Sequence, residues 1–294
     1  MADPNITESP FPSIPVAPKM YDGGKSISFR CYKGIRCWNA CCANIDITLT
    51  PYDIVRLKTR LEMESGDFLR QYTEPYELEK DGIAGVKFKP VEGGTACQFM
   101  TPEGCSVYED RPTSCRYYPI ALVSMRKQDE YTDTASYALV KEPHCKGHEA
   151  DRTLTIDEYR AEQGVAAYDE QDRGWRQLIL KKTSSGPTIG KPSLRSRQLF
   201  FIACYDVDLF RQFVASEGFQ TSFALEETEF NTLMQDDVAM MHFGVRFLKQ
   251  VLFGEMSIET REEAVKAREA KLLAEQQAQI ERHSYDAANE PTDS

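Results

Sequence analysis

Cysteine is the residue that most constrains this sequence. Eight of the nine cysteines lie between residues 31 and 145, and the ninth is Cys204. The concentrated cysteines are Cys31, Cys37, Cys41, Cys42, Cys97, Cys105, Cys115 and Cys145. Thiols gathered at this density serve either disulfide bonds or a metal site. Whichever use applies, the fold of residues 31–145 must bring these side chains together.

The rest of the sequence favours a metal over disulfides. The N-terminal residues lack the basic start and apolar run of a signal peptide, and no 18-residue apolar stretch is present. We therefore expect a cytoplasmic protein, whose thiols stay reduced. An odd number of cysteines also leaves one unpaired in a full disulfide scheme, and disulfide frameworks belong mostly to small secreted domains.

Composition excludes several classes of partner. The formal net charge is −11, and Lys and Arg do not cluster densely. Nucleic acid and anionic membrane surfaces both require clustered positive charge, so we expect neither as a partner. Hydrophobic residues make up 41% of the chain, which is enough to bury an ordinary core. The expected partner is a metal ion or cluster, and a protein partner stays open.

The cysteine spacing predicts a thiolate metal site more strongly than it identifies the metal. Thiolates suit zinc and iron–sulfur clusters, but the spacing matches neither a zinc finger nor the common ferredoxin pattern. Adjacent residues such as Cys41 and Cys42 point in different directions on a regular backbone, and a polynuclear centre can accept both. We therefore favour an iron–sulfur cluster over zinc, with all eight cysteines as candidate ligands. One of Cys41 and Cys42, and the isolated Cys145, are the weakest members.

Other candidate groups near the thiols are few. Histidines flank Cys145 at positions 144 and 148, and His242 lies in an apolar stretch typical of a buried helix. The charge of several thiolates must be offset, and three neighbouring arginines are candidates for this: Arg36, Arg111 and Arg116. For Arg116 an ordinary structural role is equally compatible with the sequence. Cys204 follows Phe200-Phe201-Ile-Ala, where a lone cysteine behaves as a small hydrophobic residue, so we exclude it from the site.

Two stretches resemble a known family. They are Cys37-Trp-Asn-Ala-Cys41-Cys42 and the run Cys105-Ser-Val-Tyr-Glu-Asp-Arg-Pro-Thr-Ser-Cys115-Arg-Tyr-Tyr-Pro119. They resemble the bacterial cysteine-cluster proteins of the YkgJ type, described as zinc- or iron-chelating CxxCxxCC domains. The resemblance covers roughly residues 25–150 and implies metal chelation by the matched cysteines. A related cysteine-cluster region occurs in flagellin lysine N-methylases, although no glycine-rich nucleotide loop follows a strand here.

The expected fold class is α+β, with a small cysteine-rich domain of short strands and helices followed by a mainly α-helical domain. We predict a flexible N-terminal arm at 1–19, the cysteine-cluster domain at 20–150, the helical domain at 151–255, and a charged helix with a disordered tail at 256–294. Strands are expected at 27–29, 45–49, 85–90 and 97–100, the last two paired with each other, and a hairpin should join 120–125 to 131–140.

The clearest helix signals are the capping residues at Thr50 and Thr155. Thr50 and Pro51 predict the start of a helix that ends near Ser65, followed by a short helix at 67–72. A capping box begins at Thr155, and a further helix should carry Trp175. A linker is expected at 181–193, a helix at 199–214 that breaks near 206–208, and one helix at 230–253. The last two should form a hairpin packed on the cysteine domain.

Three functions remain open from the sequence. The first is a metal-binding protein whose thiolates hold an iron–sulfur cluster or zinc in a structural or redox role. The second is an enzyme, an S-adenosylmethionine-dependent protein-lysine N-methylase. The third is an interaction protein that hands metal to a client, for which the exposed tail is the only support.

Overall fold

The structure is a computed structural model of the whole chain. It describes residues 19–79, 83–125, 134–184, 193–267, 269–270, 273–274 and 276–278. The N-terminal arm predicted at 1–19 therefore lies outside the described residues except for Lys19. The disordered tail predicted at the end of the range 256–294 lies outside them as well, because the described residues end at 278.

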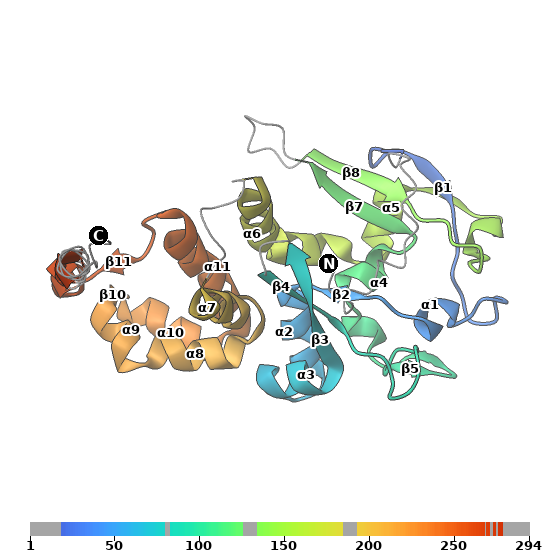
Figure 1. Cartoon of the computed structure of the whole chain (residues 1–294). Helices are drawn as coiled ribbons and strands as arrows, with labels where there is room; N and C mark the ends of the chain where they lie inside the picture. The colour runs from blue at the N-terminus through green and yellow to red at the C-terminus, as the bar shows by residue number, and fades with distance from the viewer. Residues whose placement is uncertain are drawn as a thin grey trace, which may run out of the picture.

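The strands are short and lie in small antiparallel sheets (Figure 1). The three-stranded sheet has the order β2–β4–β3, and the pairs are β1–β9, β5–β6, β7–β8 and β10–β11. Their bounds are β1 (Ser26–Ser28), β2 (Thr48–Leu49), β3 (Thr73–Glu79), β4 (Ile83–Phe88), β5 (Met100–Thr101), β6 (Gly104–Cys105), β7 (Ile120–Met125), β8 (Thr134–Leu139), β9 (Thr153–Thr155), β10 (Phe223–Ala224) and β11 (Glu259–Thr260).

Helices make up most of the regular structure and dominate the C-terminal half. They are α1 (Ala40–Ala43), α2 (Pro51–Arg60), α3 (Ser65–Tyr72), α4 (Thr113–Tyr117), α5 (Ile156–Glu162), α6 (Val165–Ser184), α7 (Leu194–Tyr205), α8 (Val207–Ala215), α9 (Glu217–Ser222), α10 (Glu227–Gln235) and α11 (Asp237–Phe253), with 3-10 turns at Tyr108–Asp110 and Gly147–Glu149. In Figure 1, α7 to α11 gather at one end of the molecule, and α1 and β5 lie at the other. The α+β class is confirmed.

Local signals placed most elements correctly. The helix predicted to start at Thr50 is α2, where Thr50 and Asp53 form a reciprocal capping box, but it ends at Arg60 and not near Ser65. Thr155 and Glu158 form a second capping box at the start of α5. The hairpin predicted from residue 120 is β7–β8, and the break predicted at 206–208 separates α7 from α8. Capping side chains bond the unpaired backbone N–H groups at the start of a helix, and their residue types can be recognised in the sequence. The two helix starts could therefore be predicted from the sequence alone.

Several predictions about the elements are wrong, and one strand was not predicted. The partners of β4 are β2 and β3, whereas Cys97 forms only an isolated bridge with Pro90. The stretch Thr73–Glu79 carries a proline and several acids and does not read as a strand, but β3 lies at the sheet edge, where these residues are tolerated. The helix predicted at 230–253 is two helices, because Asp236 caps α11 through the N–H groups of Val238 and Ala239. The first residues of the linker predicted at 181–193 belong to α6.

Two hydrophobic cores hold the described residues together. The first core joins α2, α3, β2 and β4 to α7, α8 and α11, with Phe68, Phe210 and Leu248 among its most buried side chains. The second core is smaller and consists of Ile27, Phe29, Tyr117, Ile120, Tyr137, Leu154, Ile156, Tyr159 and Val165. Both cores take residues from both sides of position 150. The division of the chain into domains stays a prediction.

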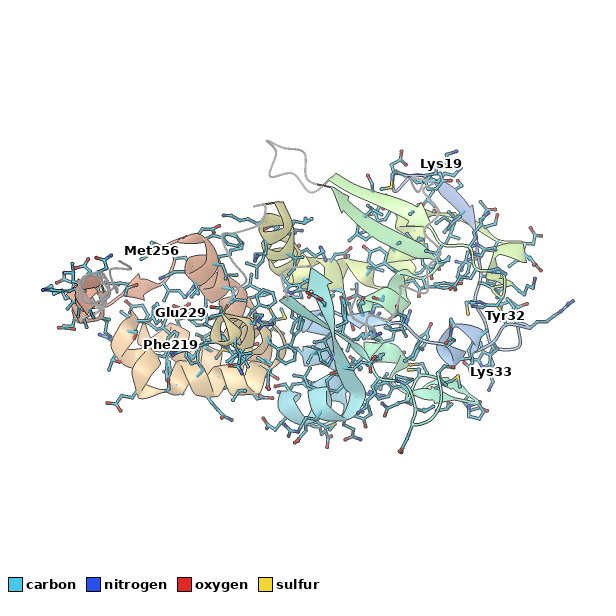
Figure 2. All side chains as sticks on the ribbon, in the orientation of Figure 1. Lys19, Tyr32, Lys33, Phe219, Glu229 and Met256 are labelled. Carbon is cyan, nitrogen blue, oxygen red and sulfur yellow. The ribbon has the colours of Figure 1, made fainter. Side chains whose placement is uncertain are left out.

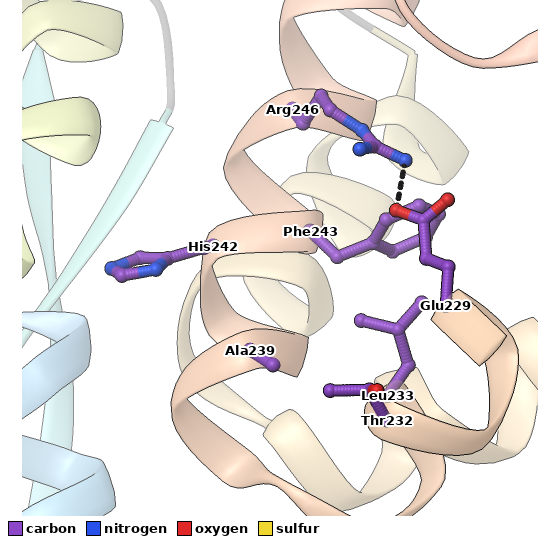
Figure 3. Close-up of a pocket in the computed structure, with 7 residues that line it drawn as sticks. All are labelled: Glu229, Thr232, Leu233, Ala239, His242, Phe243 and Arg246. Atoms are coloured by element: carbon purple, nitrogen blue, oxygen red, sulfur yellow. Dashed lines mark ion pairs between the residues drawn. The ribbon is translucent and has the colours of Figure 1, made fainter.

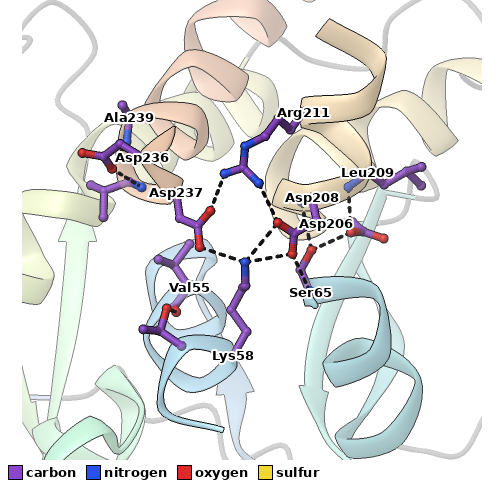
Figure 4. A network of polar contacts seen from close by, with 12 residues as sticks. Val55, Lys58, Ser65, Asp206, Asp208, Leu209, Arg211, Asp236, Asp237 and Ala239 are labelled. Carbon is purple, nitrogen blue, oxygen red and sulfur yellow. Dashed lines mark hydrogen bonds and ion pairs between the residues drawn. The ribbon is translucent and has the colours of Figure 1, made fainter. Parts of the chain in front are cut away.

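A charged network reinforces the contact between the N-terminal half and the C-terminal helices (Figure 4). Lys58 of α2 donates to Asp208 of α8 at 3.0 Å and to Asp237 of α11 at 2.8 Å. Arg211 also contacts both carboxylates, and the Ser65 N–H donates to Asp208 at 2.7 Å. Burial opposes the charge of Asp208, but the Lys58 and Ser65 hydrogen bonds outweigh it and lower the pKa of Asp208. This network helps to fix the C-terminal helices α7 to α11, called the helical layer below, on the remainder of the fold.

Candidate metal centre

The eight clustered cysteines come from separate segments that converge at one end of the molecule. Cys41 and Cys42 occupy the short helix α1, Cys105 ends β6, and Cys115 lies in α4. The other four are in loops. Figure 2 labels Tyr32 and Lys33, the residues after Cys31, near α1 and far from Phe219 of the helical layer. All nine cysteines of the chain are free thiols in the structure.

The adjacent pair Cys41 and Cys42 is in direct contact. Their sulfur atoms lie 3.8 Å apart. The hydrogen bond between the two thiols lowers the pKa of Cys41 to about 7 and raises the pKa of Cys42 well above its ordinary value. Cys41 is therefore the thiol most ready to ionise and to bind a metal at neutral pH.

The remaining thiols influence one another electrostatically. Burial, followed by the neighbouring thiols Cys41, Cys37 and Cys145, raises the pKa of Cys31 to about 11. Burial is also the main reason that the pKa of Cys115 is raised, and Cys97 and Cys105 raise it further. Like charges at short range disfavour ionisation, so these shifts record that the sulfurs are neighbours. A positive metal reverses this penalty, because it favours the thiolate form of each ligand.

Backbone N–H groups are directed at several of the sulfur atoms. The Lys146 N–H donates to the Cys37 sulfur at 3.2 Å. Burial raises the pKa of Cys97, but N–H groups of Phe99 and Met100 bond its sulfur and oppose that effect. The Val107 N–H acts in the same way on Cys105. N–H donors that stabilise negative sulfur are typical of the surroundings of a thiolate metal site.

Tyr118 is a functional candidate that the sequence analysis missed. Its hydroxyl is buried beside Cys145 and Glu142, and it makes no hydrogen bond of normal geometry with the described residues. Burial, together with Cys145 and Glu142, raises the pKa of Tyr118, so the hydroxyl keeps its proton. A buried hydroxyl that lacks an acceptor can donate to a thiolate at Cys145. The only sequence signal was its place three residues after Cys115.

The neighbouring arginines divide into different roles. Arg111 lies close enough to lower the pKa of both Cys31 and Cys105, against the larger effect of burial, as expected for a residue that offsets thiolate charge. Arg116 instead donates to the carbonyls of Arg111 and Gln163 and stacks on the Tyr168 ring at 4.2 Å. Arg116 therefore holds the loop in place, which is the structural role left open above. A role for Arg36 stays a prediction.

The histidines and the ninth cysteine lie apart from the thiols or have other partners. His148 bonds the Val140 carbonyl at 3.1 Å, and His144 faces Glu142 at 3.4 Å. His242 bonds the Gln171 carbonyl from α11. Cys204 is buried in the first core on α7, which agrees with its exclusion from the site.

The described residues do not by themselves complete a metal site. Among them, no group of three or more His, Cys, Asp or Glu side chains is arranged to hold a metal ion. The fold brings several of the sulfurs into one neighbourhood. The donor set nevertheless fits a thiophilic metal, because the nearby groups are thiols, amide N–H donors, one arginine and an unsatisfied hydroxyl.

A second feature lies in the helical layer and has no link to the thiols. A cavity of about 270 Å³ lies between α10 and α11, lined by Leu233, Phe243 and neighbouring residues (Figure 3). Its charged groups Glu229 and Arg246 pair with each other at 2.6 Å.

No helix among the described residues has the length and apolar character to cross a membrane.

Comparison with known proteins gives one match. The family model "CxxCxxCC: Putative zinc- or iron-chelating domain" matches residues 30–177, half of the 294-residue chain. This range includes all eight clustered cysteines and leaves out Cys204. No curated protein and no solved structure matches the chain. The match gives no support to the methylase or metal-delivery alternatives.

Proposed function

The chain belongs to the family of zinc- or iron-chelating CxxCxxCC domains, and we propose that its eight clustered cysteines are the thiolate ligands that hold the metal. The observation that carries this proposal is the convergence of thiols from distant segments into one electrostatically linked group. Ionising several buried, neighbouring thiols costs free energy unless a cation neutralises the thiolates. Reduced thiols of this kind also suit the cytoplasm as the place where the protein acts.

We infer an iron–sulfur cluster in preference to zinc. All-thiolate ligation, N–H donors on the sulfurs and an adjacent cysteine pair are the conditions that polynuclear iron sites use. Zinc accepts the same ligands, and a zinc ion enclosed by four thiolates has a structural role, whereas an iron–sulfur cluster can also transfer electrons. Finding zinc would therefore leave only the structural role, whereas finding an iron–sulfur cluster would leave the redox role open.

The test is anaerobic purification of the full chain, followed by elemental analysis and a visible absorption spectrum. An iron–sulfur protein is brown and contains iron and acid-labile sulfide in stoichiometric amounts. A colourless protein with stoichiometric zinc would replace the iron proposal and keep the thiolate site. Absence of both metals from aerobic and anaerobic preparations would overturn the proposed function.

A further inference from the structure

The segment that carries the first cysteines is basic and exposed. Residues 30–45 contain three basic residues and no acidic residue, although the whole chain has a net charge of −11. The three basic residues are all exposed, and they are Arg30, Lys33 and Arg36. Cys31 and Cys41 are exposed in the same segment. Positive charge and thiols therefore reach the surface together, at the end of the molecule where Figure 2 labels Lys33.

The fold adds basic groups from distant segments. The Lys146 N–H donates to the Cys37 sulfur at 3.2 Å, and the Lys146 side chain is 42% exposed. Arg111 is buried beneath this surface, close enough to act on both Cys31 and Cys105. Basic residues that are spread along the sequence are thus brought to the exposed side of the thiols.

Two aromatic rings are exposed beside these basic groups. Tyr32 is 46% exposed and Tyr108 is 53% exposed. The Arg30 guanidinium lies 5.2 Å from the centre of the Tyr32 ring, and the Arg111 guanidinium lies 4.0 Å from that of Tyr108. Tyrosine and arginine are enriched where proteins bind one another. We call the surface formed by residues 30–37, 41, 108 and 146 the thiol face.

Acidic side chains leave the thiol face net positive. Lys33 pairs with Glu103, and Lys146 pairs with Glu149 at 2.8 Å, but both are pairs of solvent-exposed side chains. Exposed ion pairs are weak, so these lysines can turn to the carboxylates of another protein. Neither Arg30 nor Arg36 pairs with an acid among the described residues. Glu142, the acid near Cys41, faces His144 at 3.4 Å.

Resting on the proposed iron–sulfur centre, we propose that the thiol face is the docking site of an acidic electron-transfer protein. Carboxylates of the partner meet Arg30, Lys33 and Arg36, and its apolar contact surface meets the two exposed tyrosine rings. Electron-transfer partners meet through small interfaces, and complementary charge speeds their encounter. The exposed thiols Cys31 and Cys41 bring the centre close to the docked partner. The reduced partner loses one electron and the oxidised cluster gains it, and no bond is formed or broken.

The test is stopped-flow reduction of the full chain, purified anaerobically with its cluster oxidised. The probe is the hydroquinone form of a flavodoxin, a small acidic flavoprotein, because the flavin semiquinone that appears reports the loss of one electron. The second-order rate constant should fall by about tenfold or more when the ionic strength rises from about 0.02 M to about 0.5 M, because salt screens the charges that steer the encounter.

Charge reversal locates the docking site. Arg30→Glu combined with Lys33→Glu should lower the rate constant at low salt by about tenfold or more and weaken its dependence on salt. The matched control is Arg195→Glu combined with Arg197→Glu, because both arginines are exposed on α7, at the far end of the molecule from α1 (Figure 1). The control should leave the rate constant unchanged. Iron and sulfide content and far-UV circular dichroism should be the same in all three chains, and if the first double variant lacks its cluster, Lys33→Glu alone takes its place.

The outcomes separate the docking site from the metal site. A rate constant that does not respond to salt, an equal loss of rate in both double variants, or an intact cluster that flavodoxin does not reduce would overturn the docking proposal alone. A chain without an iron–sulfur cluster is recognised by its absorption spectrum before mixing. That result would overturn the iron–sulfur proposal itself, and the docking proposal with it.

Discussion

Replacing Asp172 with asparagine should remove a pH-dependent loss of stability from the folded chain. Asp172 is fully buried on α6, where one oxygen accepts the Tyr52 N–H at 3.2 Å and the other makes no hydrogen bond of normal geometry with the described residues. Asp53 is buried nearby but accepts three hydrogen bonds, from the Thr50 N–H and from the N–H and hydroxyl of Thr113. Burial raises the pKa of Asp53 as well, but its three hydrogen bonds favour the charged form, so we assign the single negative charge of the pair to Asp53.

The magnitude follows from the shifted pKa. Burial, and then the charge of Asp53, raises the pKa of Asp172 to about 8. An unfolded aspartate has a pKa of about 3.9. Between these values the folded chain keeps a proton that the unfolded chain releases, so stability falls as pH rises. The slope is about 1.4 kcal/mol per pH unit, or about 4 kcal/mol between pH 4 and pH 7.

The assay is urea unfolding of wild type and Asp172→Asn at several pH values from 5 to 8, followed by circular dichroism at equal metal content. The free energy of unfolding of the variant, minus that of the wild type, should rise by about 1.4 kcal/mol for each pH unit. The difference removes the contribution of the thiols, which both chains share. Glu170→Gln, an exposed acid on the same helix, is the control and should give no slope. A flat difference for Asp172→Asn would refute the reasoning.

Three further outcomes are expected. Lys58→Met removes one of the two cations shared by Asp208 and Asp237, while Arg211 still pairs with both, so it should cost about 1–3 kcal/mol in urea unfolding, and an unchanged free energy of unfolding would contradict the role of the network. Because the folded pKa of Asp208 is lowered, wild-type stability should be retained above about pH 4 and lost as the pH falls further, and in Asp208→Asn this acid loss should be smaller. Cys204→Ala should lower stability by about 1 kcal/mol while metal content stays unchanged, and loss of metal would return Cys204 to the site.

Much of the local structure could be predicted because its causes lie within a few residues. The capping box at Thr50, the break at Asp206 and the β7–β8 hairpin each depend on neighbouring residue types. The partner of β4 could not be predicted this way. Strand pairing is decided by contacts between distant segments, and β3 carries residues that only an edge strand tolerates.

The candidate site also contains features that the sequence predicts and features that it does not. The cysteines, their number and the family motif were readable from the sequence, since thiol chemistry and spacing are properties of the chain itself. The roles of Arg116 and Tyr118 were not readable. Arg116 bonds carbonyls of the chain, and Tyr118 lies beside Cys145, because loops distant in sequence are packed together.

By itself, the sequence predicted that the clustered thiols form one site and that a thiophilic metal is their partner. Only the tertiary structure decided which thiols are neighbours. The backbone bonds from Lys146 and Cys97 bring distant cysteine segments together, and one turn of α1 places the sulfurs of Cys41 and Cys42 in contact. The physical reason is that ligand chemistry belongs to each residue, whereas proximity is created by burial of side chains far apart in the chain.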